Sequence, residues 1–274
     1  MGVPMAANLA RAGYAVQSYD KRGNGTHASV RQAAESVDVL VTMLPDGDAV
    51  REVVLDALPA LKRGALVIDM SSSDPAGTRA LGAALSPQKI SMVDAPVSGA
   101  LPKAKEGTLA IMVGGSAADV ARAQRVLRRL GKDIFHVGPL GAGHAVKALN
   151  NYLGAAGTLA GFEALLVARA FGLEPQPVLD AINASTGRNW TTERKIPLQI
   201  LTGAFASGFK LALMAKDVGI AADLAKDLGV DTPYLRETLK LWRDAVKQMP
   251  AQADHTEIYK YLLNRSTVRK KRKR

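Results

Sequence analysis

The chain of 274 residues has no cysteine, which excludes disulfide bonds and thiolate metal sites. Four histidines are present, at His27, His136, His144 and His255. They lack the spacing of metal ligands, so we expect no metal. Aromatic residues make up only 5% of the chain, and no apolar run approaches the ~20 residues of a membrane span. No signal segment opens the chain, and we expect a cytoplasmic protein without a membrane partner.

Acidic residues are fewer than basic ones, 25 against 36, which gives a formal net charge of +11. The last six residues, 269–274, are all basic and leave +5 for everything before them. A run of like charges repels itself, so we expect residues 265–274 to form a disordered basic tail. A lone basic run is weak support for a nucleic-acid partner, and we expect no specific one.

The first half of the chain alternates short β-rich runs with helical patterns, which predicts a parallel sheet with helices on both faces. The predicted strands are Tyr14–Tyr19, Val39–Met43, Leu66–Met70, Ser91–Val93 and Asp133–Val137. The predicted helices between them are Pro4–Ala12, Val30–Val37, Ala49–Leu58, Pro75–Leu85 and Ala117–Leu130.

The character of the chain changes at residues 138–141, and one long helix is predicted from Gly143 to Phe171. Three glycines in this helix, at 154, 157 and 161, cost about 1 kcal/mol each against alanine. They are explained if another helix packs closely there, so we expect a homodimer or homotetramer. Further helices are predicted at Pro177–Ala184, Leu213–Leu228, Pro233–Gln248 and Glu257–Asn264.

Two runs of residues suggest the chemistry. The first, Asp94 to Ala100, is a turn of small residues that offers backbone N–H groups and a hydroxyl, and a buried-looking strand follows it. Such a turn can hold a small carboxylate. The second places Lys147 and two amides on successive turns of the predicted helix, with Asn151 four residues after Lys147 on the same face. To act as a base near neutrality, the lysine must have its pKa of about 10.4 lowered by burial or by nearby positive charge.

These two runs resemble the β-hydroxyacid dehydrogenase family, which includes enzymes acting on 3-hydroxyisobutyrate. The resemblance covers nearly the whole chain, because the start, Met1 to Leu9, and a late segment, Phe209 to Ala222, also match. It implies an NAD(P)-dependent oxidoreductase that transfers a hydride between the cofactor and a small 3-hydroxy acid. Ala100 stands where the family usually has a second glycine.

The resemblance also assigns roles to residues of the substrate site. Lys147 is expected to be the catalytic general acid/base. Ser98, Gly99, Asn151 and Lys216 are expected to bind the substrate. His144 is interpreted as a packed or capping histidine, Asp94 as the residue that fixes the turn, and Asp217 as structural.

The expected fold is α/β, with a Rossmann-like NAD(P)-binding domain at 1–139 and an all-helical substrate and dimerisation domain at 140–264. A dinucleotide fold needs a strand, a glycine-rich turn and then a helix. Here Gly2 would be the last glycine of that motif, so the first strand is expected to be missing. Asp20, 18 positions later, can accept hydrogen bonds from ribose hydroxyls and favours NAD. The cations beside it, Lys21 and Arg22, leave NADP possible.

The remaining cofactor contacts are implied by the resemblance alone. Met5 belongs to the matching start of the chain. Leu44 and Pro45 lie on the turn after the predicted strand Val39–Met43, where the family covers the adenine-nucleotide side. Ser72 follows the next strand, near the nicotinamide ribose in the family. A serine triplet before Asp-Pro is equally typical of a turn and a helix cap.

Several alternatives stay open. The substrate of such an enzyme could be 3-hydroxyisobutyrate, tartronate semialdehyde, L-threonate or 4-hydroxybutyrate. A non-catalytic binding module of the same fold would not need a lysine at position 147. 6-Phosphogluconate dehydrogenases are much longer, and imine reductases typically lack this lysine.

Overall fold

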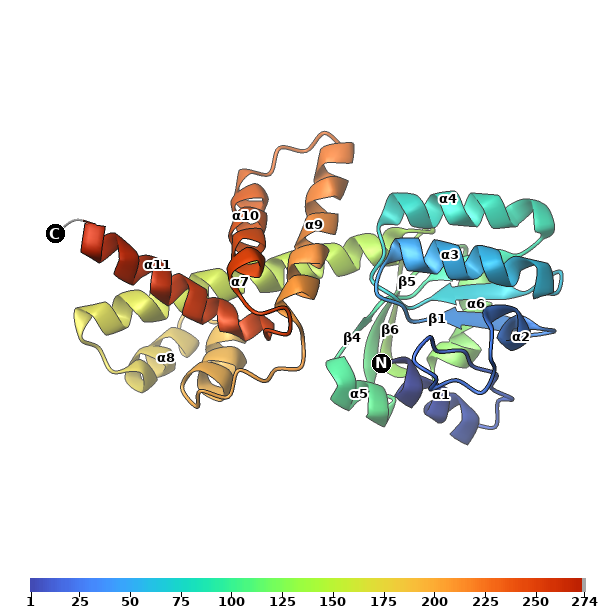
Figure 1. Ribbon diagram of the computed structural model, residues 1–274, viewed down its shortest axis with the longest axis horizontal. Coiled ribbons are helices and arrows are strands. Elements are labelled where there is room, and N and C mark those ends of the chain that lie inside the picture. Colours follow the sequence, from blue (N-terminus) through green and yellow to red (C-terminus); the bar gives the residue numbers. More distant parts are fainter. Residues whose placement is uncertain (273–274) are drawn as a thin grey trace. The chain divides into compact units, whose positions relative to one another are not determined.

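The computed structural model describes residues 1–272, and the chain divides into two compact units, Met1–Lys147 and Ala148–Arg274 (Figure 1). The units divide eight residues after the boundary expected between 139 and 140. The extra residues in the first unit, 140–147, include the first turn and a half of helix α7 (Ala142–Phe171), whose start is hydrogen-bonded to that unit.

The first unit is built on a mixed six-stranded sheet. Strands β1 (Val39–Thr42), β2 (Leu66–Asp69) and β3 (Ser91–Asp94) are parallel neighbours. Strand β5 (Leu109–Gly114) runs antiparallel to β3 and to β4 (Val97–Ser98), while β6 (Gly131–Gly138) is parallel to β5. The prediction of a wholly parallel sheet was therefore wrong. The connection from β4 to β5 is shorter than the dozen or more residues that a parallel crossover needs.

Apolar side chains of the central strands point alternately to the two faces of the sheet, which explains why helices cover both faces (Figure 1). Leu66 and Ile68 point into the core that α1 and α6 share, whereas Val67 points into the core of α3 and α4. The four helices are α1 (Gly2–Arg11), α3 (Gly47–Ala57), α4 (Pro75–Leu85) and α6 (Ala117–Leu127). Asp74 caps α4 and Pro75 opens it, as that dipeptide predicted.

The segment Tyr14–Tyr19 is not a strand, which corrects the prediction. Its backbone bonds are local, as when the N–H groups of Thr26 and His27 donate to the carbonyl oxygen of Ser18. A strand needs a neighbouring strand for its ladder, and none pairs with this segment among residues 1–272. The other short elements of the unit are α2 (Val30–Ala34), α5 (Ala100–Glu106), η1 (Leu58–Ala60) and η2 (Ser86–Gln88).

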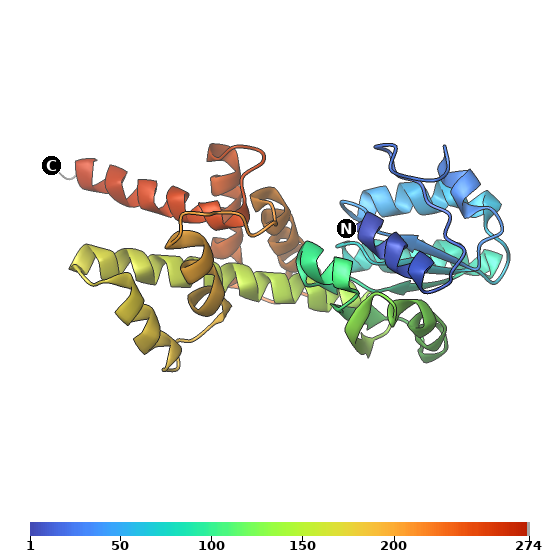
Figure 2. The same ribbon diagram turned by 90° about the horizontal axis from the view of Figure 1, so that it is seen from below.

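The second unit is helical, and its core is formed by apolar side chains from every long helix. Trp242 and Phe162 are the largest of those that are fully buried, and Phe162 meets Tyr259 edge-on with ring centroids 5.5 Å apart. This contact joins α7 to α11, which lie side by side in Figure 2. The remaining elements are α8 (Pro175–Asn183), α9 (Leu211–Asp227), α10 (Pro233–Gln248), α11 (Ile258–Arg272), η3 (Thr191–Ile200) and η4 (His255–Glu257).

Two features of this unit differ from the expectation. The segment η3 is a π-helix with Pro197 inside it, where no helix was predicted. Residues 265–272 continue α11 instead of forming a disordered tail, because adding a residue to a helix whose first turns are packed costs little. The last two residues of the expected tail, 273–274, lie outside the described residues.

Helix α7 is long and apolar enough to cross a bilayer by length and composition alone. Phe162 and Leu165 on this helix are buried in the core of the second unit. The core helix of a globular protein meets the same two criteria, so its apolar character is explained by packing.

Candidate functional site

Polar groups meet at the carboxyl ends of β1 and β2 in the first unit. The hydroxyl of Thr42 donates to Asp69 Oδ1 at 2.9 Å, and the backbone N–H of Leu44 donates to Ser71 Oγ at 2.9 Å. A Cβ on Gly2 would lie 3.8 Å from the Cβ of Met43, so the start of α1 adjoins the end of β1. The structure thus brings the turn of Leu44, the serine loop and Gly2 to the sheet edge where α/β folds bind ligands.

The groups at this edge suit a dinucleotide. Met1 precedes α1 without a side-chain cap in the described structure, so the first N–H groups of α1 have the character of an anion site. Pro45 is exposed and Ser72 is half-buried on the neighbouring loops. Met5 is instead buried in the core of the unit, so the fit to the cofactor does not rest on its side chain.

Asp20 ends the irregular segment that replaces the predicted strand. Its Oδ1 accepts a hydrogen bond of 2.7 Å from the backbone N–H of Arg22, and the residue is half-buried. This bond is that of a local turn. The ribose contact of Asp20 stays a prediction.

The turn that is predicted to bind the substrate begins at Asp94, the last residue of β3, and includes β4. Gly99 has φ +133°, and a Cβ there would collide with the side chain of Lys103. Ala100 adopts the left-handed φ of +54°, which costs a non-glycine residue about 1 kcal/mol. The backbone therefore explains why a glycine is favoured at position 100, and Ser98 lies half-buried just before it.

Asp94 and His144 hold the first turn of α7 to this turn. The Asp94 carboxylate accepts bonds of 2.7 Å from the N–H groups of both Gly141 and His144. His144 is buried, with Nδ1 2.8 Å from Thr78 Oγ1. The interpretation of His144 as a packed residue is confirmed, whereas the bonds of the Asp94 side chain hold the start of α7. Lys147 lies one turn further along α7 and is half-buried.

The predicted substrate residues of the second unit are joined by one carboxylate. Asn151 Nδ2 donates to Asp217 Oδ2 at 2.6 Å, and Lys216 Nζ lies 3.3 Å from Asp217 Oδ1. Asp217 is buried, as expected of a structural residue, and it orients both side chains. Asn150 is exposed and donates to Asn151 Oδ1 at 3.1 Å.

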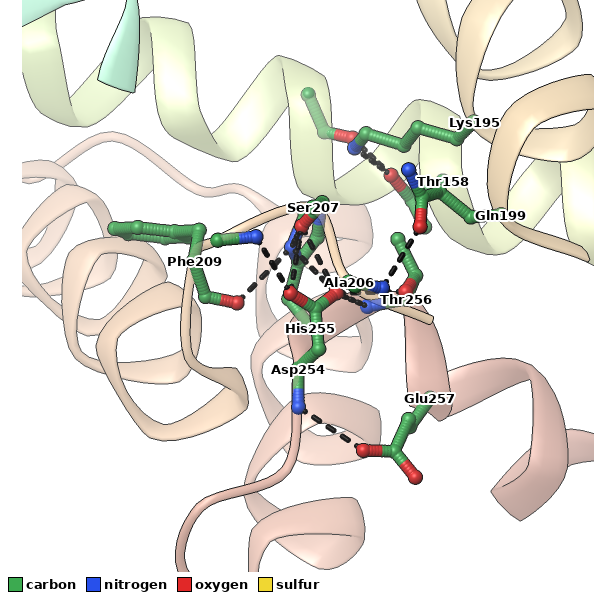
Figure 3. A network of polar contacts seen from close by, with 12 residues as sticks. Thr158, Lys195, Gln199, Ala206, Ser207, Phe209, Asp254, His255, Thr256 and Glu257 are labelled. Atoms are coloured by element: carbon green, nitrogen blue, oxygen red, sulfur yellow. Dashed lines mark hydrogen bonds and ion pairs between the residues drawn. The ribbon is translucent and has the colours of Figure 1, made fainter. Parts of the chain in front are cut away.

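A partly buried polar network in the second unit was not predicted from the sequence (Figure 3). Ser207 Oγ lies 2.8 Å from Asp254 Oδ2 and 2.9 Å from His255 Nδ1, while Lys195 Nζ donates to Thr158 Oγ1 at 2.6 Å. These residues come from three segments far apart in the chain, so no spacing could reveal them.

The network shifts the pKa of its ionisable members. Burial lowers the pKa of Lys195 to about 8. Burial, with a further contribution from the charge of Lys195, lowers the pKa of His255 to about 4. Burial raises the pKa of Asp254, but hydrogen bonds from Thr256 and Ser207 and the charge of His255 outweigh it and leave this pKa lowered.

Two family models match the chain. Residues 1–138 match the NAD binding domain of 6-phosphogluconate dehydrogenase. Residues 141–262 match the family described as NAD-binding of NADP-dependent 3-hydroxyisobutyrate dehydrogenase. The two matches meet where α7 begins.

Similar proteins include several dehydrogenases. A 2-(hydroxymethyl)glutarate dehydrogenase of Eubacterium barkeri is 38% identical over 85% of this chain and 82% of its own length. An NAD-dependent L-serine dehydrogenase of Pseudomonas aeruginosa is 35% identical over 95% of this chain and 94% of its own length. The solved structure of a Mycobacterium tuberculosis 3-hydroxyisobutyrate dehydrogenase with L-serine has a TM-score of 0.89 at 32% identity, covering 96% of this chain and 95% of that one.

The NAD-binding sheet, the helical unit and these matches define an NAD(P)-dependent oxidoreductase acting on CH–OH groups. The predicted class of enzyme, cofactor and fold are therefore confirmed. More particularly, the chain belongs to the β-hydroxyacid dehydrogenase family.

Proposed function

We propose that the enzyme oxidises a small 3-hydroxy acid with the core HOCH₂–CH(R)–COO⁻, as 3-hydroxyisobutyrate has. The substrates in the names of the relatives, 2-(hydroxymethyl)glutarate, L-serine and 3-hydroxyisobutyrate, all share this core and differ in R. The single observation that carries the proposal is Lys147, half-buried on the helix that Asp94 fastens to the Ser98 turn. Tartronate semialdehyde reduction and L-threonate oxidation are the second candidates.

The proposed site divides the chemistry among its residues. The Ser98–Gly99 turn binds the carboxylate, and Asn151 and Lys216, oriented by Asp217, bind the polar groups of the substrate. Lys147 Nζ takes the hydroxyl proton during oxidation and returns it to the oxygen during reduction. A bound nicotinamide would supply the redox chemistry, taking the hydride from the carbinol carbon in oxidation and giving it to the carbonyl carbon in reduction. A non-catalytic binding module has no need of Lys147.

A steady-state screen tests the proposal. We expect turnover of 3-hydroxyisobutyrate, L-serine or 2-(hydroxymethyl)glutarate and a KM for NAD about tenfold below that for NADP, because Asp20 repels a 2′-phosphate. Asp20→Ala should narrow that ratio, whereas the matched change Glu52→Ala, at an exposed acidic residue of α3, should leave it unchanged. Absence of turnover on every acid with this core would refute the proposed substrate class, and a lower KM for NADP would assign the cofactor choice to Lys21 or Arg22.

We also propose that the enzyme is a cytoplasmic homodimer or homotetramer, with no membrane or specific nucleic-acid partner. Support for assembly comes from α7, where Leu149, Leu153, Val167 and Phe171 are exposed at helical spacing. An apolar stripe of this length is typical of a surface that a second copy covers.

Leu153→Glu should weaken self-association about a hundredfold or more, because a charge would be buried in the interface. Leu228→Glu is the matched control, since Leu153 and Leu228 are both 68% exposed and only Leu153 lies on the stripe. Sedimentation velocity at micromolar concentration distinguishes the two. An unchanged oligomer in Leu153→Glu would show that assembly uses another surface.

A further inference from the structure

The start of α7 is capped by a residue from another element. The first N–H groups of a helix have no partner within it. Here the N–H groups of Gly141 and His144 both donate to Asp94, a buried carboxylate at the end of β3 that is 47 and 50 positions away in sequence. The N-terminal end of a helix carries a partial positive charge, so the negative charge of Asp94 is also stabilising there. Asp94 therefore fixes where α7 begins on the sheet.

Two glycines allow this close approach. A Cβ on Gly114 would collide with Asp94 Oδ1, and a Cβ on Gly143 would collide with the carbonyl oxygen of Met112 and approach Asp94 Oδ2 within 2.8 Å. The first turn of α7 thus packs on the backbone of the sheet with no side chain between them. Contacts between backbones leave little room for the helix to tilt or slide.

His144 fixes the other side of the same turn. Its Nδ1 is hydrogen-bonded to Thr78 on α4, and its Nε2 lies 3.5 Å from Asp69 Oδ2. Asp69 is itself held by bonds from the Ser71 N–H, at 2.9 Å, and from the Ser73 hydroxyl, at 2.8 Å. His144 Nε2 makes no hydrogen bond within the described residues, so its approach to Asp69 places α7 beside the residue that holds the serine loop at the end of β2.

We propose that Asp94 and His144 are positioning residues, which together set the location of Lys147 relative to the Ser98 turn. Lys147 follows His144 by three residues, about 4.5 Å along the helix axis. The main chain of Asp94 leads directly into the turn that carries Ser98. One carboxylate therefore fixes both the proposed base and the proposed carboxylate-binding turn. This inference rests on the proposed role of Lys147.

Asp94→Asn tests the inference with little change of shape. The substitution replaces one carboxylate oxygen by an NH₂ group. Because this donor then faces an N–H group at the start of α7, one hydrogen bond is lost and the first turn is held less firmly. We expect kcat to fall about tenfold to a hundredfold, with the KM for NAD within about twofold of wild type. We also expect the pH dependence of kcat/KM to shift, because the surroundings of Lys147 change. If the role of Asp94 were merely structural, activity would fall in proportion to the fraction of folded enzyme, by the same factor at every pH.

Matched variants keep the result interpretable. Ser29→Ala removes the side-chain cap of α2 in the same unit, a helix that carries no proposed site residue, and should leave kcat unchanged. If Asp94→Asn does not fold, His144→Asn keeps a polar atom near Thr78 but removes the approach to Asp69, and the same fall in kcat is expected.

A double-mutant cycle separates this inference from the proposed function. In a Lys147→Ala background, Asp94→Asn should change the residual rate by less than about twofold, because it acts through the missing lysine. A further fall by the full single-mutant factor would overturn the positioning role. So would a wild-type kcat in Asp94→Asn alongside an inactive Lys147→Ala. Retained activity in Lys147→Ala would instead overturn the proposed function first, and this inference with it.

Discussion

Lys147→Ala should lower kcat about a thousandfold or more while the Kd for NAD stays within about twofold of wild type. Removal of a positioned general acid/base typically costs 10²–10⁴-fold, and here the same amine is also expected to stabilise the developing alkoxide. The proposed cofactor residues lie on α1, on the segment between α1 and α2 that carries Asp20, and on the loops after β1 and β2, so we expect NAD binding not to depend on this side chain. Single-turnover kinetics and NAD titration measure the two quantities.

Two further lysine variants sharpen this result. Lys147→Arg keeps a positive charge but cannot release a proton near neutral pH, so it should be nearly as inactive as the alanine variant. Lys226→Ala removes an exposed lysine of α9 and should behave as wild type. An active Lys147→Arg enzyme would show that the residue supplies charge and not proton transfer.

The protein should lose about 3 kcal/mol of unfolding free energy through His255 alone as the pH falls from 6.5 to 4. The pKa of His255 is lowered from 6.5 to about 4 in the folded protein, chiefly by burial. Between these pH values the unfolded chain binds a proton that the folded chain does not, so stability falls as the pH falls. Each unit of pKa is worth 1.36 kcal/mol, which gives the expected size.

His255→Phe should flatten this dependence, because no imidazole remains to titrate. Leu235→Ala provides the control: it destabilises the same buried core but leaves the imidazole in place, so the wild-type slope should persist. Urea unfolding of the second unit, followed at several pH values, measures the slopes. Equal slopes in His255→Phe and wild type would contradict a buried, neutral His255.

Lys195 contributes in a different pH range. Its pKa is lowered to about 8 in the folded protein. Below pH 8 the ammonium is therefore charged in both the folded and the unfolded chain, and the cost of removing it from water lowers the unfolding free energy. This unfavourable contribution is relieved only above pH 8. The contribution of Lys195 therefore stays constant between pH 6.5 and 4, where the effect of His255 is measured.

Local patterns predicted most of the helices correctly. The bounds of α4 and α10 are those predicted, because a capping residue and a proline mark the first and a proline with a strong apolar face marks the second. The long helix α7 was also predicted, since nothing in its sequence interrupts it. The strand predicted at Tyr14–Tyr19 does not form, because a strand needs a neighbouring strand, and its own residues do not show whether one is present.

The sequence by itself determined the class of enzyme, because the Asp94–Gly99 turn and the Lys147 helix are contiguous patterns that resemble those of a known family. It also marked Asp94 as a fixed turn residue. Only the tertiary structure decided what Asp94 holds and why Gly114 and Gly143 must be glycines. It likewise decided the network of Asp254 and His255. These contacts join atoms from distant segments, and their energies depend on distance and burial, which the order of residues does not contain.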